Sequence, residues 1–282
     1  MYLHAQRGSG IFWPVIVLLS LILIGSNISS ASVTPKVAAG SHHSLALKSD
    51  GTVWAWGYNL YGGLGDGSNT DRHTPVQVSN FSGVIAVAGG YYHSLAVKSD
   101  GTVWAWGIND YGELGDGTKT HKTTPVQVSS ISDVIAVACG TWHSLALKSD
   151  GSVWAWGFNK YSQLGDGTTT DRSTPVQVSS LSGVIAVAGG FSHSLALKSD
   201  GTVWAWGNNR YGQLGDGTSS DRTTPVQVNF NLGQTSPTPS PTLTPTQITT
   251  PTVHTGSATN ITSSSATLNG TVNPNGLSTT VW

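Results

Sequence analysis

A fifty-residue repeat is the feature that most restricts the fold of this chain. The segment HSLALKSDGTVWAWG, residues 43–57, returns almost unchanged at positions 93, 143 and 193. The repeated region runs from about residue 33 to residue 228 without insertion, and each copy carries four short runs of β-forming residues. No window of the repeat places apolar residues at the period of an α-helix. Internal periods of this length with four strands per copy are typical of β-propeller blades.

The sequence therefore predicts an all-β protein whose main part is a β-propeller of four four-stranded repeats, either a small ring or part of a larger one. The chain contains 35 Gly and 11 Trp residues, and only 10% of its residues are charged, as expected for tight turns and aromatic packing. If the ring stays open, its exposed edges favour self-association with another copy. The blades are expected at residues 33–82, 83–132, 133–182 and 183–233.

The repeated segment itself predicts a packing hairpin. A two-residue type I′ turn at Asp50 and Gly51 requires positive φ at both positions, which this dipeptide tolerates. Such a turn would pair Leu47 with Trp54, so that one hairpin face carries Leu and Trp and the other carries Ala. We expect the bulky face of one blade to pack against the small face of the next. The same structural role is expected for Asp50, Asp100, Asp150 and Asp200.

Two sets of repeated polar residues raise the question of a metal site. The first set opens the second strand of each copy and consists of His43, His93, His143 and His193. No Cys or carboxylate accompanies these residues at metal-ligand spacing, so we expect each His to fix a loop within its own blade. The second set is Asp66 and its copies in LGDG, which suggest calcium but lack the alternating acids of a calcium loop. The sequence therefore predicts no metal, no cofactor and no catalytic residue.

The N-terminal residues 1–32 are predicted to be an export signal or a membrane anchor. Arg7 precedes the apolar run IFWPVIVLLSLILIG at residues 11–25, and small residues including Ser29 and Ala31 follow it. This order is typical of a cleavable secretory signal. The run is short for a spanning helix, which needs about 20 residues, but an uncleaved anchor remains an alternative. Either case predicts an extracellular or cell-surface location, with membrane attachment only through this segment.

The C-terminal part is expected to be a linker followed by the start of another module. Residues 234–253 alternate Pro with Ser and Thr, which predicts an extended spacer. Residues 254–282 contain two alternating β-runs around NPNG, too little chain for a β-sandwich of the usual size. We therefore expect an incomplete β-sandwich module here, and a sequence that is part of a longer protein.

The run GxxHSLALKSDGTVWAWGxNxYGQLGDGT, clearest at residues 190–218, resembles the repeat of the regulator of chromosome condensation family. The resemblance covers about 195 residues in four consecutive units. It implies a β-propeller, usually of seven blades, whose members act mostly through protein–protein contacts. The export signal favours the secreted bacterial type of this family over its nuclear nucleotide-exchange factor. Residues 254–282 resemble the start of a fibronectin type III-like module.

Positions that differ between the copies are free to recognise a partner. They lie just before each repeated His and just after each WAWG, in loops that we expect on one rim of the propeller. Varied aromatic and charged residues are typical of a protein-recognition surface. The predicted binding residues are Tyr58, Tyr91, Tyr92, Asp110, Trp142, Phe158, Lys160, Phe191 and Arg210.

The favoured function is a non-catalytic module that binds an extracellular protein or glycan through this rim. The formal net charge of −1 provides no basic surface for nucleic acid or an anionic membrane. An enzyme needs a convergent pair of acids or a nucleophile with its base, whereas the repeat offers four copies of the same turn acids. The alternative is a targeting or spacer domain within a larger extracellular enzyme or inhibitor.

Overall fold

The computed structural model describes residues 32–232, 252–255 and 270–273. All regular secondary structure in these ranges is β-strand, and sixteen of the strands form four antiparallel four-stranded sheets. Within each sheet the strands follow chain order, each pairing with the next. This arrangement confirms the predicted all-β propeller. None of the described residues forms a helix long and apolar enough to cross a membrane, and residues 1–31 lie outside the described ranges.

Each sheet is one blade, numbered here in chain order. Blade 1 consists of β1 (Lys36–Ala39), β2 (His43–Leu47), β3 (Val53–Gly57) and β4 (Arg72–Gln77). Blade 2 consists of β5 (Val84–Gly89), β6 (His93–Lys98), β7 (Val103–Gly107) and β8 (Lys122–Gln127). Blade 3 consists of β9 (Val134–Cys139), β10 (His143–Lys148), β11 (Val153–Gly157) and β12 (Arg172–Gln177). Blade 4 consists of β13 (Val184–Gly189), β14 (His193–Lys198), β15 (Thr202–Gly207) and β16 (Arg222–Asn231).

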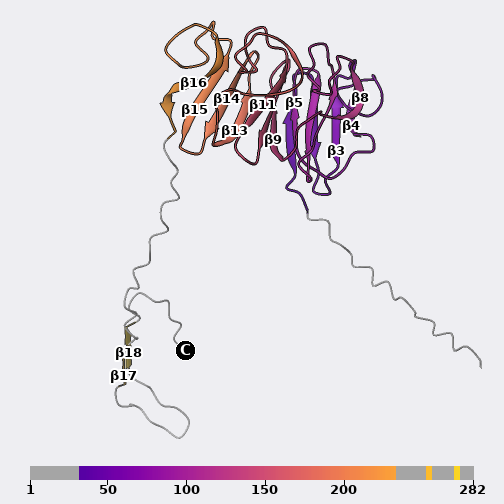
Figure 1. Cartoon of the computed structure of the whole chain (residues 1–282). Helices are drawn as coiled ribbons and strands as arrows, with labels where there is room; N and C mark the ends of the chain where they lie inside the picture. The colour runs from indigo at the N-terminus through magenta and orange to yellow at the C-terminus, as the bar shows by residue number, and fades with distance from the viewer. Residues whose placement is uncertain (1–31, 233–251, 256–269, 274–282) are drawn as a thin grey trace, which may run out of the picture.

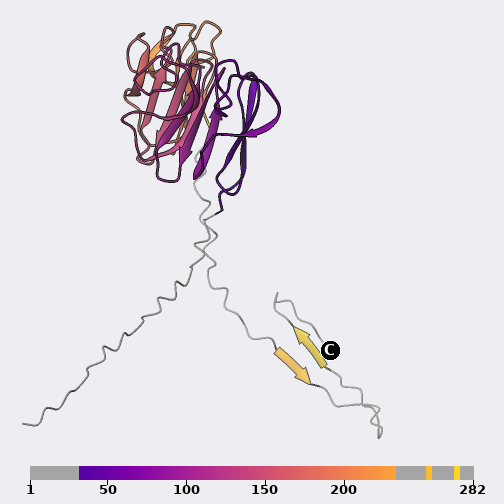
Figure 2. The same ribbon diagram turned by 90° about the vertical axis from the view of Figure 1, so that its right-hand side faces the viewer.

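The four blades follow one another side by side (Figures 1 and 2). The first strand of each blade is innermost, and β5 packs against both β1 and β9, while β9 packs against β13. Strands β1 and β13 have no comparable packing with each other in the described part of the chain. The four blades therefore form a row with two free ends.

The C-terminal segment contributes one further strand pair to the described residues. Strand β17 (Thr252–Thr255) pairs antiparallel with β18 (Gly270–Asn273). The first of these strands begins inside the range expected to be linker. The rest of the predicted fibronectin type III-like module, residues 254–282, lies outside the described residues, so that prediction stays a prediction.

The repeated hairpin has a different turn from the predicted one. The Lys48 N–H donates to Thr52 O at 2.9 Å and the Gly51 N–H donates to Lys48 O at 3.0 Å. The loop therefore has three residues, and only its last residue, Gly51, has a positive φ, of 78°. This is a type I turn closed by a left-handed glycine. The two-residue type I′ turn was wrong, and the Asp50 carboxylate instead accepts hydrogen bonds from Thr52 N (3.0 Å) and Oγ1 (2.6 Å).

The longer turn shifts the register of the hairpin by one residue. Leu47 pairs with Val53 rather than with Trp54, and a one-residue shift moves every side chain of a strand to the other face. Leu and Val therefore share one face with a small Ala, while Ala, Ser and Trp share the other. The prediction that opposite faces of neighbouring blades pack together is confirmed, but the predicted composition of those faces was wrong. We call them the Leu face (Leu45, Leu47, Val53, Ala55) and the Trp face (Ser44, Ala46, Trp54, Trp56), with their equivalents in other blades.

The Leu face of each blade packs on the Trp face of the next. Between blades 1 and 2, the Leu face residues Leu45 and Leu47 form one buried cluster with Ala96 and Trp106. The same clusters recur between blades 2 and 3, around Trp156, and between blades 3 and 4, around Trp206. All three of these Trp side chains are fully buried. Burial of such large side chains is the main favourable contribution to blade stacking.

A polar chain crosses each blade interface beside the Trp. The indole N–H of Trp106 and the hydroxyl of Ser94 both donate to Gly63 O at 2.8 Å, and His43 Nε2 lies 2.8 Å from Ser94 Oγ. Equivalent contacts join blades 2 and 3 and blades 3 and 4. The expectation that each His fixes a loop of its own blade was therefore wrong for His43, His93 and His143, because each of these rings reaches the serine of the following blade.

The glycine three residues before each His is required by this arrangement. A Cβ built on Gly90 would collide with Cε1 of the His93 imidazole, and Gly140 has the same relation to His143. Each ring therefore lies flush against the backbone of its own blade while Nε2 contacts the next blade. This packing explains the Gly-x-x-His spacing of the repeat, for which the sequence alone suggested a loop contact.

The buried imidazoles predict a stability loss in mild acid. Burial lowers the pKa of His43 to about 4, and the pKa of His93 and of His143 to about 3. The unfolded chain takes up these protons below its usual histidine pKa of about 6.5, whereas the folded chain does not. The free energy of unfolding should therefore fall by about 1.4 kcal/mol per pH unit for each imidazole between about pH 6 and 4. Urea titrations at pH 7, 6, 5 and 4 measure this slope.

A His93→Gln variant is the matched control for this titration. The Gln amide nitrogen keeps a donor directed at Ser144, but the side chain does not titrate. The slope of its unfolding free energy against pH should be smaller than that of the wild type, by the contribution of one imidazole. A wild-type free energy of unfolding that is flat between pH 6 and 4 would contradict the buried neutral histidines.

Candidate binding surface

The variable loops of each blade lie together on one rim. The backbone N–H of Tyr58, which follows WAWG, donates to the carbonyl of His42, which precedes the repeated His, at 2.9 Å. The same bond joins Ile108 to Tyr92 at 3.1 Å and Phe158 to Trp142 at 2.8 Å. The Asp-Gly hairpins lie at the other ends of the same strands. The structure therefore brings the two predicted variable segments together in every blade.

Aromatic rings form a continuous cluster across blades 1 and 2 on this rim. Tyr92 is its centre, with ring centroids 5.0 Å from Tyr58, 5.2 Å from Tyr61 and 4.2 Å from Tyr91. His42 lies 4.9 Å from Tyr91. Hydrogen bonding to Tyr91 raises the pKa of Tyr92 to about 12, so this phenol is neutral at physiological pH. Tilted and edge-to-face contacts of this kind stabilise the rings against one another.

The cluster continues into blade 3. The ring of Trp142 lies 4.9 Å from Tyr91, and Tyr111 lies 5.9 Å from Trp142 and 4.7 Å from Phe158. These rings are partly exposed rather than buried. The aromatic rim is therefore one surface built from three blades, defined by the side chains of His42, Tyr58, Tyr61, Tyr91, Tyr92, Tyr111, Trp142, Phe158 and Tyr161.

Four members of the aromatic rim were not among the predicted binding residues: His42, whose position varies between the copies, and three Tyr residues at one repeated position. Tyr61, Tyr111 and Tyr161 occupy a position that holds Tyr in all four copies, and identical positions were interpreted as blade structure. The side chains of Tyr61 and Tyr111 nevertheless pack on variable rings of the next blade. Their adjacency to the variable residue after WAWG, three positions earlier, was the available signal.

The predicted charged residues surround the aromatic rim without forming one cluster. Asp110 lies 2.9 Å from His121 Nε2, so its carboxylate has a partner within its own blade. Lys160 is exposed and has no ion pair within residues 32–232. Arg210 lies over the Tyr211 ring, 5.7 Å from its centroid. The surface therefore combines a continuous aromatic centre with separate charges of both signs.

Blade 4 extends the surface in a more open form. Phe191 and Tyr211 are 70% and 83% exposed, because no blade follows to pack against them in the described chain. Together with Tyr161, His193 and Arg210 they line a pocket of about 330 Å³. Of the predicted binding residues, Phe191 and Arg210 are the two that lie in this pocket.

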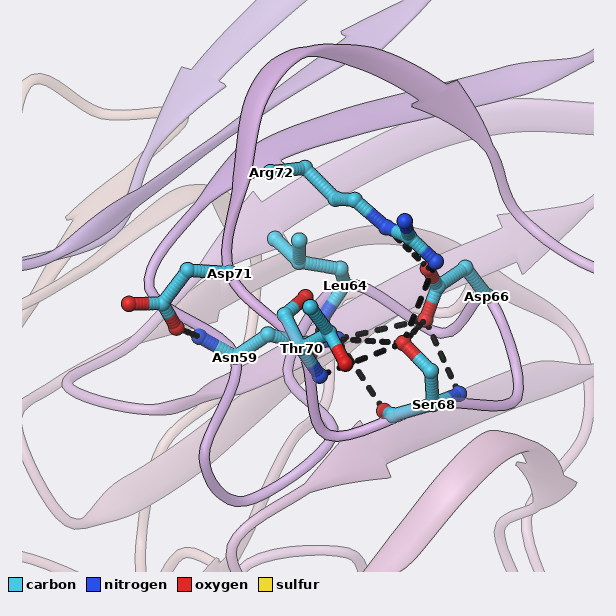
Figure 3. Close-up of polar contacts among 7 residues, drawn as sticks. All are labelled: Asn59, Leu64, Asp66, Ser68, Thr70, Asp71 and Arg72. Atoms are coloured by element: carbon cyan, nitrogen blue, oxygen red, sulfur yellow. Dashed lines mark hydrogen bonds and ion pairs between the residues drawn. The ribbon is translucent and has the colours of Figure 1, made fainter.

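The loops that carry the rim are held by a buried asparagine that sequence reasoning did not identify. The Asn59 amide nitrogen donates to the backbone oxygens of Ser68 and Thr70 at 3.0 and 3.1 Å, and its side-chain oxygen accepts the Leu64 N–H at 3.0 Å (Figure 3). Asn109, Asn159 and Asn209 make the same bonds in the other blades. One side chain therefore fixes the long loop between the third and fourth strands of each blade.

The LGDG aspartates complete this loop. Asp66 accepts hydrogen bonds from Ser68 Oγ at 2.8 Å and from Asn59 at 3.2 Å, and it pairs with Arg72 at 2.7 Å (Figure 3). Burial acts to raise the pKa of Asp66, but the hydrogen bonds from Ser68 and Arg72 outweigh it, and the pKa is lowered. Asp71 accepts the Asn59 N–H at 2.7 Å. No cluster of potential metal ligands occurs among residues 32–232.

Among the described residues, Glu113 is the one buried acid without such partners. Its Oε2 accepts the Tyr111 N–H at 2.9 Å, while Oε1 is buried and has no partner. Burial raises the pKa of Glu113 to about 7. Blades 3 and 4 have Gln163 and Gln213 at this position, and both accept the same backbone bond.

A Glu113→Gln variant should therefore be more stable than the wild type at alkaline pH. A carboxyl with a raised folded pKa destabilises the fold as pH rises from about 4.5 to about 7, at about 1.4 kcal/mol per pKa unit. The gain at pH 8 should be on the order of 2–3 kcal/mol, and it should largely vanish at pH 5. Urea midpoints at the two pH values measure it.

The reciprocal Gln163→Glu variant is the matched control in blade 3. It should lose stability at pH 8 but not at pH 5. Equal effects of either substitution at both pH values would show that a change in packing, and not ionisation, is responsible.

The comparisons with known proteins agree with this fold. The family description "Regulator of chromosome condensation (RCC1) repeat" matches residues 50–97, 100–147, 150–197 and 200–266. A second description of the same repeat matches residues 36–62, 84–113, 134–163 and 184–213. The ultraviolet-B receptor UVR8 of Arabidopsis thaliana is 43% identical over 49 residues, which are 17% of this chain and 11% of the receptor.

Solved structures show the same architecture over most of the described chain. Human WBSCR16 is 28% identical with a TM-score of 0.62, covering 70% of this chain and 54% of that one. Yeast RCC1 (Prp20), solved bound to Kap60, is 23% identical with a TM-score of 0.62, covering 69% of this chain and 48% of that one. This chain thus spans about half the length of these solved relatives. The repeats, the blade topology and these matches together show that the chain belongs to the regulator of chromosome condensation (RCC1) repeat family.

Proposed function

We propose that this chain is a secreted or cell-surface binding module, without catalytic activity of its own, that recognises a protein partner through the aromatic rim. The observation that carries the proposal is the continuity of that rim over three blades. The repeat keeps its packing residues almost identical, while the residues before each His and after each WAWG differ from blade to blade. Partly exposed Tyr, Trp and Phe side chains are the residues most enriched where proteins bind one another.

The geometry of the rings favours a protein over a glycan as the partner. A sugar stacks on one flat aromatic face, whereas the rings of this rim are tilted to one another by varied angles, such as 39° between Tyr58 and Tyr92 and 79° between Tyr111 and Trp142. An irregular aromatic surface flanked by charges suits the side chains of a protein. The solved relatives support the same class of partner. One Prp20 structure contains Kap60, and another Prp20 structure is described together with its binding to Gsp1p and histones.

The proposed location rests on the sequence of residues 1–32, with its charged start, apolar run and small residues. This order is what export machinery recognises. The partner is therefore expected outside the cytoplasm, and the partners of the yeast relative are not carried over. Mass spectrometry of the N-terminus of the protein recovered from the medium or the cell surface distinguishes cleavage from retention of this segment.

Alanine substitutions in the aromatic rim should remove binding and leave the fold intact. Tyr92→Ala and Trp142→Ala each remove a central, partly exposed ring, for which a loss of affinity of at least tenfold is expected. Retention of extracellular proteins on the immobilised chain, followed by titration of the retained protein, measures this loss. The melting temperature, measured in parallel, should change by only a few degrees.

Ile135→Ala provides the matched control. Ile135 is an exposed apolar residue at the hairpin end of blade 3, away from the aromatic rim, so its truncation should leave affinity unchanged. If the wild type binds members of a glycan panel and the same two rim variants do not, the partner is a carbohydrate and not a protein. Equal retention by wild type and both rim variants would reject the rim as the binding surface.

A further inference from the structure

The interface between blades has two different halves, and the chain leaves one of each without a partner. Blades 1, 2 and 3 each present a Leu face to the following blade, and blades 2, 3 and 4 each present a Trp face to the preceding one. Within the described residues, the Trp face of blade 1 and the Leu face of blade 4 are not covered. These two free faces lie at opposite ends of the row of blades.

Both free faces are more exposed than the equivalent faces between blades. In blade 2, Ser94, Ala96 and Trp106 are completely buried, whereas the equivalent residues of blade 1, Ser44, Ala46 and Trp56, are partly exposed. At the other end, Leu195, Leu197 and Val203 are partly exposed, although their equivalents in the three earlier blades are buried. Residues that differ only by their place in the row therefore differ in burial, because no blade packs on the two free faces within the described residues.

The hydrogen-bonding groups at the two free faces are complementary as well. Every Trp face with a neighbour donates from its indole N–H and its serine hydroxyl to one carbonyl of the preceding blade. Trp56 and Ser44 carry the same donors, and the carbonyl of Gln213 is the equivalent acceptor in blade 4. Among the described residues, none of these three groups has its interface partner.

An outer contact repeats the same relation. The N–H of Gly67 donates to Thr123 O at 2.9 Å, Gly117 to Ser173 O at 2.9 Å, and Gly167 to Thr223 O at 2.9 Å. The next donor in this series is Gly217 of blade 4, and the corresponding acceptor is the carbonyl of His73 in blade 1. Both lack this bond within the described ranges.

We propose that a second copy of this chain docks head to tail, with its blade 1 Trp face on the blade 4 Leu face of the first copy. The contact would repeat the interface that already joins the blades, with Trp56 of the second copy placed against Leu195 and Leu197. Trp56 and Ser44 would donate to Gln213 O, His193 would contact Ser44 Oγ, and Gly217 would donate to His73 O. Because the two halves are different surfaces, the contact is heterologous, and because it repeats the rotation between blades, two copies that use both ends close into a ring.

The second copy is the occupant that the sequence itself specifies. Blades 1 and 4 differ from their interface-forming counterparts at few positions, so each free face already has the shape and donors that fit the other. An unrelated partner would need to reproduce a Leu face or a Trp face. The proposal concerns the ends of the row and is independent of the aromatic rim, so either can fail without the other.

Two substitutions separate the two ends. Ala46→Arg places a charged side chain on the Trp face of blade 1, and Leu195→Arg does the same on the Leu face of blade 4. Light scattering coupled to size exclusion measures the mass of each chain at micromolar concentrations. The measured mass of the wild type should be at least twice the chain mass of 29.3 kDa. Each variant alone should have the mass of one chain. Leu197→Lys replaces Leu195→Arg if the latter does not unfold cooperatively.

Mixing the two variants gives the decisive result. The intact Leu face of Ala46→Arg fits the intact Trp face of Leu195→Arg, so an equimolar mixture should form a dimer of twice the chain mass and nothing larger. A wild type that stays monomeric would overturn the proposal. Association of one variant with itself would also overturn it, because that result indicates a symmetric contact or association through another segment such as residues 11–25.

Discussion

The contact between the Leu face of one blade and the Trp face of the next is the interaction on which the rest of this structure depends. A single four-stranded sheet of this size buries little by itself, and repeats of this kind gain stability from their neighbours. Here each interface buries one complete Trp side chain, and its indole N–H is satisfied by a carbonyl of the preceding blade. That carbonyl belongs to the residue before the Leu of LGDG, so the same long loop supports both the interface and the rim.

Much of the fold was predictable because repetition reveals the number of strands in each repeat and the turns between them. The register of the hairpin was not, although the Asp-Gly dipeptide was correctly interpreted as a turn. Asp-Gly suits both a two-residue turn and a type I turn ending in a left-handed glycine. In this hairpin only Gly51 has a positive φ. The Asp50 carboxylate accepts hydrogen bonds from the Thr52 N–H and hydroxyl, which fit the three-residue loop. One residue of loop length then decides which side chains face the neighbouring blade.

Comparing identical and varied positions of the repeat distinguished packing residues from binding residues only in part. The buried asparagine at Asn59 and its copies was hidden by its identity in all four blades, since it resembled any polar loop residue until its five hydrogen bonds were visible. The His residues were predicted to be structural, but no pattern within one blade indicates that His43, His93 and His143 contact the Ser of the next blade. Contacts between blades depend on how repeats stack, and this information is absent from a single repeat.

The open end of the row lies next to the aromatic rim, so an assembly through the ends would affect recognition at the rim although the two surfaces bind separately. Tyr61 and Tyr111 each pack on a varied ring of the following blade, at positions 92 and 142, whereas Tyr211 is 83% exposed. In a head-to-tail assembly, the residue that meets Tyr211 is His42 of the next copy, since it is the equivalent of Tyr92. The assembly would then carry one aromatic rim on each copy, and a partner with repeated epitopes would bind several copies at once. Linked sites raise apparent affinity without any new contact, so the strength of recognition at the rim would depend on the packing of Leu against Trp at the ends of the row.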